Sequence, residues 1–197
     1  MENTDPTEPK KITGISITGE TIEFDSYEEW EMYQWCIEAK DHDLLRGFTY
    51  HPHTYKLSER VSVKVAKTNK RTGAMIGVKD KFLFHPHSYT PDFYLWVAPA
   101  LVRLCPAHGL HLVSGFAVVD VKGAFSRFHD QKSFSINQKW VYQLYGHVVC
   151  KVVPEKFFFN TWVPEECRYT QKKRDVRKKY SSIRTLSELL ADAAVDD

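Results

Sequence analysis

Short segments of the first half of the chain alternate apolar and polar residues, as β-strands do. Residues 12–24, ITGISITGETIEF, place isoleucines at alternating positions between glycines, which predicts a β-hairpin. Residues 48–67 are again β-like, and residues 64–82 carry six basic side chains around two glycines. This basic stretch predicts a hairpin or loop with a charged rim.

Residues 24–40, FDSYEEWEMYQWCIEAK, have helical spacing instead. Trp30, Tyr33 and Ile37 fall on one side of such a helix, and that side is expected to be buried. An aspartate and a serine precede the helix, and either can cap its first turn. The segment therefore predicts a helix between two β-regions.

The second half contains three more regular elements. Residues 89–97 and residues 116–123 (FAVVDVKG) are strand candidates that we expect to pair, and residues 98–115 between them predict an irregular connection. Residues 135–146 predict a helix that ends at a glycine cap, and residues 147–153 predict a further buried strand. This order of elements predicts an α/β or α+β fold, with a sheet covered by helices.

The length and composition indicate one folded unit. A chain of 197 residues with 43% hydrophobic and 14% aromatic residues can bury a core and is too apolar for intrinsic disorder. We expect residues 1–11 to form a frayed tail, residues 12–166 to form the domain, and residues 167–197 to form a basic extension with an acidic end.

Charge and cysteine usage narrow the function classes. The net charge is only +2, so affinity for a polyanion must depend on where the charges lie. The four cysteines are widely spaced and the first residues lack an apolar leader, which predicts reduced thiols in a cytoplasmic protein. Because no apolar run reaches about 18 residues, we expect no membrane insertion.

Residues 168–184 form a strongly basic run, with eight Lys or Arg and one Asp. Through Lys172, Lys173, Lys178 and Lys179 this run can follow nucleic-acid phosphates. The alternative is a solvated helix face, which charge runs usually are.

The candidate chemistry lies on the two paired strands. Because alternate strand residues share a face, Phe116, Val118, Asp120 and Lys122 are expected on one side. Asp92, on the neighbouring strand, can then meet Asp120. Two converging carboxylates suit Mg²⁺ or Mn²⁺, and such an ion beside a lysine supports hydrolysis of a phosphodiester.

A third carboxylate is expected from the capped helix, where Glu28, Glu29 and Glu31 compete. Glu29 lies at the border of the predicted buried side, whereas Glu28 and Glu31 point away from it, so we select Glu29. The alternative is structural, because Ser26 and Glu29 have the spacing of a capping box.

The segments TPDF (90–93), VVDVKG (118–123) and FDSYEEW (24–30) together resemble the PD-(D/E)xK nuclease superfamily. Within it, the sequence is most similar to phage-type junction-resolving endonucleases and related small phage nucleases. The likeness covers residues 24–153 and implies a restriction-endonuclease-like core, in which helices flank a central mixed sheet. The long 98–115 connection and the basic stretch depart from the family pattern.

The resemblance also implies roles for individual residues. Asp92, Asp120 and the Val121 carbonyl would bind Mg²⁺, with Mn²⁺ as a substitute. Lys122 would act at the scissile phosphate and Glu29 would complete the site.

The implied partner is DNA, with Lys132 and Gln138 at its backbone. The implied activity is that of a homodimeric, Mg²⁺-dependent endonuclease that cuts branched or structured DNA. The alternatives are a restriction-type or transposon-end nuclease, and a non-catalytic nucleic-acid binding protein on the same fold.

Two further patterns are left open. HPHTY (51–55) is nearly repeated as HPHSY (85–89), which is either coincidence or the mark of two neighbouring edge strands. Cys105, His108 and His111 lie close in sequence but lack the ligand spacing of a recognised zinc site.

Overall fold

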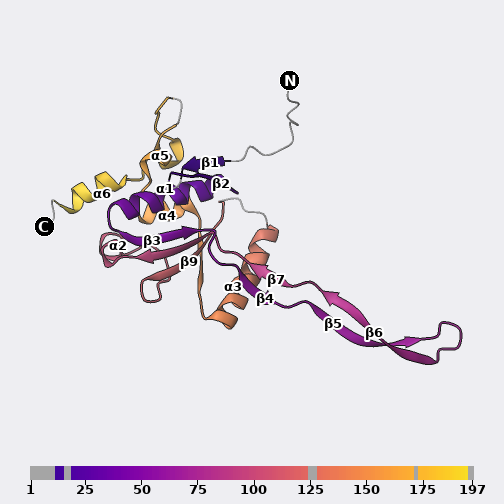
Figure 1. The fold of residues 1–197 in the computed structure, drawn as a ribbon. Coiled ribbons are helices and arrows are strands. Elements are labelled where there is room, and N and C mark those ends of the chain that lie inside the picture. The colour runs from indigo at the N-terminus through magenta and orange to yellow at the C-terminus, as the bar shows by residue number, and fades with distance from the viewer. Residues whose placement is uncertain (1–11, 16–18, 124–127, 171–172, 195–197) are drawn as a thin grey trace, which may run out of the picture.

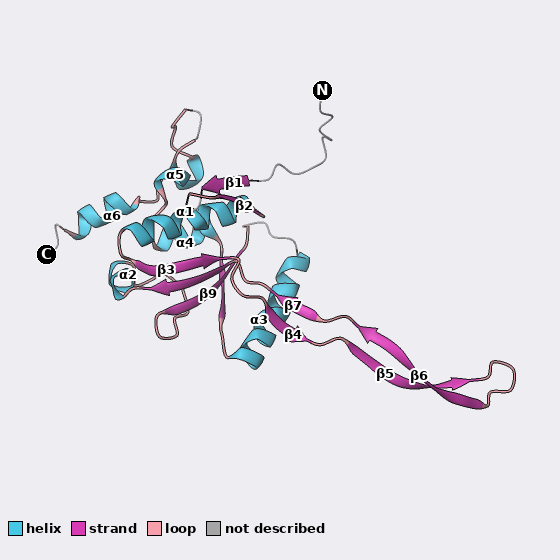
Figure 2. Ribbon diagram, viewed as in Figure 1, coloured by secondary structure: helices cyan, strands magenta, loops and turns pink. Residues whose placement is uncertain are grey.

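The computed structural model describes residues 12–15, 19–123, 128–170 and 173–194. Its elements are shown in Figures 1 and 2. In chain order they are β1 (Ile12–Ile15), β2 (Thr21–Phe24), α1 (Tyr27–Asp41), β3 (Leu45–Tyr50), β4 (Tyr55–Ser58), β5 (Val61–Thr68), β6 (Met75–Phe84), β7 (His87–Tyr89), β8 (Phe93–Val97), α2 (Pro99–Leu104), β9 (Phe116–Val121), α3 (Phe128–Tyr145), β10 (Val149–Val152), α4 (Pro154–Asn160), α5 (Glu165–Arg168), the 3₁₀ helix η1 (Lys178–Tyr180) and α6 (Leu186–Ala193).

A four-stranded mixed sheet with the order β10-β9-β8-β3 forms the centre of the fold. Strand β8 is antiparallel to both β3 and β9, whereas β9 and β10 are parallel (Figure 2). The α+β class and the pairing of the two candidate strands are therefore confirmed. Strands β1 and β2 pair as the predicted hairpin, and so do β5 and β6.

Helices α1 and α3 cover opposite faces of this sheet (Figure 1). Phe93 and Val119 point into the main hydrophobic core, which also contains the buried side chains of α1. Val118, on the other face, packs in a second core with Phe134 and Val141 of α3. Alternation along β9 thus gives each helix its own apolar surface.

Helix α1 is buried on more than the one side that its spacing predicts. Trp30 and Tyr33 are buried as expected. Trp35 is also fully buried, and its ring stacks on Trp162 at a centroid distance of 4.7 Å. The helix therefore lies between the sheet and the segment that follows β10.

The prediction that Glu31 points away from the core was wrong. Its side chain is 1% exposed, and its two carboxylate oxygens accept hydrogen bonds from Lys179 Nζ at 2.6 Å and Tyr180 Oη at 2.8 Å. The spacing of apolar residues could not reveal this, because the C-terminal segment that covers Glu31 is 148 residues away in sequence.

The residues predicted as a basic extension contribute to the same core as the domain. Cys167, Tyr180, Ile183 and Leu186 are buried in the cluster that contains Trp35. Helix α6 begins with a capping box in which Thr185 and Glu188 bond reciprocally. The positively charged residues therefore belong to a segment that packs against the hydrophobic core.

The 98–115 connection is less irregular than predicted, because residues 99–104 form helix α2. Pro99 occupies the start of this helix, where its missing N–H costs nothing. Helix α3 ends as predicted, with Gly146 at a φ of +70°. The four cysteines are buried and unpaired. None of the helices in the described part of the chain combines the length and apolarity that a bilayer crossing requires.

Glu38 joins α1 to the segment after β10. Its carboxylate accepts hydrogen bonds from Trp162 Nε1 at 3.0 Å and from the Glu165 backbone N–H at 2.7 Å. Burial raises the pKa of Glu38 from 4.5 to about 7, although both hydrogen bonds act in the opposite direction.

We predict that Glu38 makes stability depend on pH. Between pH 4.5 and about 7 the folded protein keeps a proton that the unfolded chain releases, so the free energy of unfolding should fall as the pH rises through this range. Glu38→Gln should reduce this decrease in the free energy of unfolding by on the order of 1–3 kcal/mol. Urea unfolding at several pH values measures the decrease. The exposed Glu155→Gln is the control and should keep the wild-type slope. Equal slopes for all three proteins would contradict the prediction.

Candidate metal centre

The site is at the end of the sheet where β8 begins and β9 ends. The register pairs Phe93 with Val119, which places Asp92 opposite Asp120 on the same face. The Asp92 side chain accepts a hydrogen bond from the Val121 backbone N–H at 2.5 Å. One carboxylate thus satisfies a backbone donor at the point where the strand pairing stops.

Asp120 is 3% exposed and is held from two sides. Its Oδ1 accepts a hydrogen bond from Tyr89 Oη at 2.7 Å, and its Oδ2 lies 2.5 Å from Lys122 Nζ. Apart from this ion pair, Oδ2 has no polar partner among the described residues. Lys122 Nζ also donates to the Val121 carbonyl at 3.1 Å. The ammonium therefore contacts two of the three groups predicted to bind the metal.

The electrostatics of the site disfavour the ionisation of Asp92 beside an ionised Asp120. Burial and the charge of Asp120 together raise the pKa of Asp92 to about 7, although Lys122 and the Val121 N–H act in the opposite direction. Burial and Asp120 also raise the pKa of Tyr89 far above its usual value, which keeps its hydroxyl a hydrogen-bond donor. A bound cation would stabilise the ionised forms of Asp92 and Asp120 together.

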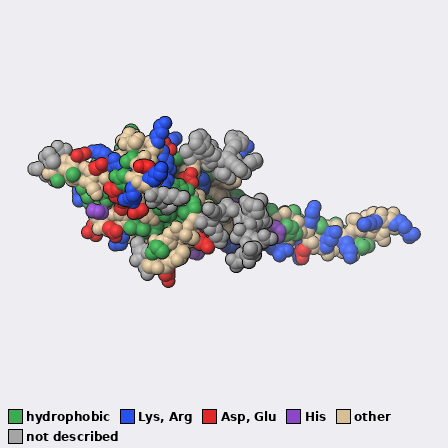
Figure 3. Space-filling view, turned by 90° about the horizontal axis from the view of Figure 1, so that it is seen from above, with side chains coloured by type: hydrophobic (Ala, Val, Ile, Leu, Met, Phe, Trp, Pro, Cys, Tyr) green, Lys and Arg blue, Asp and Glu red, His purple; other side chains and the backbone are tan. Residues whose placement is uncertain are grey.

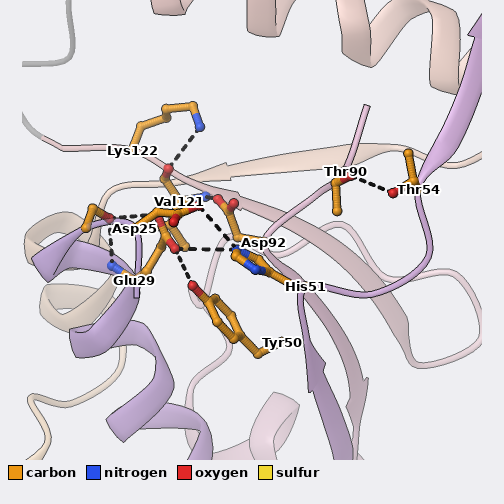
Figure 4. A network of polar contacts seen from close by, with 10 residues as sticks. Asp25, Glu29, Tyr50, His51, Thr54, Thr90, Asp92, Val121 and Lys122 are labelled. Atoms are coloured by element: carbon orange, nitrogen blue, oxygen red, sulfur yellow. Dashed lines mark hydrogen bonds and ion pairs between the residues drawn. The ribbon is translucent and has the colours of Figure 1, made fainter. Parts of the chain in front are cut away.

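Glu29 reaches the site from the first turn of α1. Ser26 is the N-cap and accepts from the Glu29 backbone N–H at 3.2 Å. The Glu29 carboxylate accepts from the Ser26 hydroxyl at 2.8 Å and from Tyr50 Oη at 2.6 Å (Figure 4). Its bond is to the serine hydroxyl and not to the serine N–H, so the capping-box alternative is only half realised.

His51 is a site residue that the sequence analysis did not select. Its Nε2 lies 3.7 Å from Glu29 Oε2 and 3.8 Å from Asp25 Oδ2, and its backbone N–H donates to the Asp92 carbonyl at 2.8 Å (Figure 4). His51 has a φ of +45°, which few residues other than glycine adopt. In the described part of the chain, Asp25, Glu29 and His51 form the one group of three His, Cys, Asp or Glu side chains whose ligand atoms all lie within 4.8 Å of one another.

The repeated pentapeptide contains two residues of this region, His51 and Tyr89. Its two copies meet at their last residues, because β4 pairs with β7 and Tyr55 lies opposite Tyr89. The other partners of β7 are Lys56 and Ser58, which follow the first copy. The two copies thus end in neighbouring strands, and their remaining residues do not pair with each other.

A cavity of about 400 Å³ opens beside the carboxylates. Glu29, Asp120 and Lys122 line it from one side, and Ser133 and Asn137 of α3 line it from the other.

The two residues predicted to contact DNA from this helix do not line that cavity. Gln138 lines a separate hollow with Lys139 and Tyr142, and Lys132 is exposed. Helical rotation separates neighbouring residues by about 100°, so Gln138 points elsewhere than Asn137.

The predicted C-terminal phosphate contacts differ from one another in their surroundings. Lys173 and Lys178 are exposed, whereas Lys179 is bound to the buried Glu31. Lys172 lies outside the described residues. Their contact with DNA stays a prediction.

The donor set at this end of the sheet fits a hard divalent cation. Asp92, Asp120 and the Val121 carbonyl offer oxygen ligands, and Asp120 Oδ2 is buried with the Lys122 ammonium as its charged neighbour. The contacts of Lys122 show that positive charge is already accommodated beside these oxygens.

Comparisons of the chain with protein-family models, with curated proteins and with solved structures found no match.

We predict that Mn²⁺ or Mg²⁺ raises the melting temperature of the protein and that EDTA reverses the effect. The rise should be larger at pH 8 than at pH 6, because protons compete with the cation at Asp92, whose pKa is about 7. Asp120→Asn should remove most of the rise by taking away a ligand charge, whereas the exposed Asp175→Asn should keep it. A melting temperature that does not respond to either ion would contradict the prediction.

Proposed function

We propose that this protein is a metal-dependent DNA endonuclease that hydrolyses phosphodiester bonds in branched or otherwise structured DNA. The observation that carries the proposal is the placement of Asp92, Asp120 and Lys122 at one end of the sheet, beside a cavity. We further propose that the four-stranded sheet between α1 and α3 is a restriction-endonuclease-like core. This is the arrangement that the PD-(D/E)xK resemblance implies.

Asp92, Asp120 and the Val121 carbonyl are the groups that would hold Mg²⁺. When bound there, the ion would supply an activated water and neutralise charge that develops on the phosphate. Two hydrogen bonds orient these ligands beforehand: Tyr89 Oη fixes Asp120, and the Val121 N–H fixes Asp92. Ligands held in this way need little rearrangement to bind a cation.

Lys122 has two roles in this proposal. Without a metal its ammonium compensates the buried charge of Asp120. If a divalent ion neutralised the carboxylate, the ammonium, which lines the cavity, would be available to stabilise negative charge on the scissile phosphate.

Glu29 and His51 complete the site on the side of α1. The Glu29 carboxylate is held by Ser26 and Tyr50 and lines the same cavity as Lys122. A carboxylate in this position can orient a water for attack, and the nearby His51 ring can hold or move a proton at Glu29 Oε2.

Binding of the DNA backbone is proposed for Lys132, Gln138 and the C-terminal lysines. A two-fold homodimer is proposed because paired cuts at a junction require two active sites. The exposed residues Ile136 and Trp140 of α3 offer apolar surface for such an association.

We predict that the protein cleaves branched DNA in the presence of Mg²⁺ and that Asp120→Asn lowers the cleavage rate by about 100-fold or more. Four-way junctions, linear duplexes and single strands of equal length should be compared on denaturing gels. The Asp175→Asn protein should cleave at the wild-type rate. DNA binding by the wild-type protein without cleavage would instead support a non-catalytic binding protein, and a cut at one unique sequence would support a restriction-type enzyme.

Lys122→Met gives an independent prediction. In this variant the ammonium no longer competes with the metal ion for the oxygens of Asp120 and Val121. Mn²⁺ should therefore bind at least as tightly as in the wild type. Cleavage should nevertheless fall by about 100-fold, because the charge at the phosphate is lost. Calorimetric titration with Mn²⁺ and single-turnover cleavage separate the two effects. If Lys122→Met weakened metal binding and left the saturated rate unchanged, the role at the phosphate would be wrong.

A further inference from the structure

Strands β5 and β6 form a two-stranded arm that projects away from the body of the protein (Figures 1 and 2). The two strands pair antiparallel over Val61–Thr68 and Met75–Phe84, and every residue of β6 is exposed. The arm buries none of its own side chains in either hydrophobic core. An isolated two-stranded ribbon is only marginally stable in water, so the arm adds little to the stability of the fold.

The arm concentrates positive charge. Residues 60–84 contain seven Lys or Arg and one acidic residue, Asp80, whereas the whole chain has a net charge of +2. Their net charge of +6 means that the rest of the chain is net negative. Lys and Arg side chains follow the arm to its tip in Figure 3. This distribution produces a strongly positive projection on a nearly neutral protein.

The register of the arm sorts its charges onto two faces. Val63 lies opposite Lys81, Val65 lies opposite Lys79, and Lys67 lies opposite Gly77. These pairs share one face, which therefore carries three lysines and no acid. On the other face Lys64 lies opposite Asp80, so the charges cancel. We call the first face, with Lys67, Lys79 and Lys81, the lysine face.

The tip extends the positive charge beyond the strands. It contains Lys70 and Arg71, and the Asn69 side chain accepts hydrogen bonds from the backbone N–H groups of Arg71 and Thr72 at 2.9 and 3.3 Å. These bonds give the turn a defined conformation.

We infer that the arm lies along a groove of duplex DNA, with its lysine face against the phosphates. This inference rests on the proposed nuclease function and adds the way in which the substrate is held. The major groove accepts a two-stranded β-ribbon. Eight residues of β5, at about 3.3 Å each, span about 26 Å, which matches seven to eight base pairs.

The position of the arm supports a duplex as its partner. β5 follows directly after β4, and β6 leads directly into β7, whose Tyr89 lines the cavity of the metal centre. A duplex with one phosphate at Asp120 therefore has its flanking base pairs in reach of the arm. The arm of a second copy is disfavoured as the occupant of the lysine face, because two such faces repel each other.

The test is a triple substitution, Lys67, Lys79 and Lys81→Ala, compared with Arg103, Lys151 and Lys156→Ala, which removes the same charge from exposed positions on the body. Binding of a 40-base-pair duplex is measured by fluorescence anisotropy at several salt concentrations, with Ca²⁺ in place of Mg²⁺. The arm variant should bind about 10-fold or more weakly, and its slope of log K against log salt should be shallower by about 2 to 3. The body variant should keep the wild-type slope, and Lys→Arg at the three arm positions should restore it.

Cleavage of a junction separates this inference from the proposed function. At saturating protein, the arm variant should cut a junction at the wild-type rate, because the arm holds the duplex and lies outside the metal centre. If the wild-type protein binds DNA through the arm but never cuts it, the inference that the arm binds DNA is supported and the nuclease proposal is contradicted. A wild-type salt slope for the arm variant would contradict the inference that the arm binds DNA, whether or not the protein cuts. Loss of a wild-type dimer in the arm variant, seen by sedimentation without DNA, would also overturn it in favour of self-association.

Discussion

The antiparallel pairing of β8 with β9 determines the positions of Asp92, Asp120 and Lys122 at the metal centre. With Phe93 opposite Val119, Asp92 and Asp120 lie side by side at the end of these two central strands. A shift by one residue would turn Asp120 toward α1 and place Val121 on the face of α3. The apolar residues that follow Asp92 and precede Asp120 prevent this shift, because each face of the sheet packs against its own helix. Core packing thus determines where the ionic groups lie.

The elements that the sequence predicted best are those with a local pattern. The hairpins, α1, β9, α3 and β10 each carry their own periodicity, and Ser26 and Gly146 mark helix ends by their local chemistry. The encounter of Asp92 with Asp120 followed from alternation once the two strands were assumed to pair. This part of the site was therefore accessible without a structure.

The remaining features depend on contacts between distant segments. Glu31 is polar in a helix position that looked exposed, and it is buried only because Lys179 and Tyr180 return to cover it. His51 belongs to the repeated pentapeptide, but its place at the site depends on the pairing of β3 with β8, which brings its backbone N–H to the Asp92 carbonyl. Helix α2 is too short for a periodic signal. For Glu31 and His51 the deciding partner is far away in sequence.

The paired strands β4 and β7 carry the arm and also border the metal centre. Since the chain leaves and returns through adjacent strands, opposed residues can be removed or inserted in the ribbon without changing the pairing of Tyr55 with Tyr89. The length of the arm can therefore change without any change at the metal centre. A longer or shorter arm is compatible with the same arrangement of ligands.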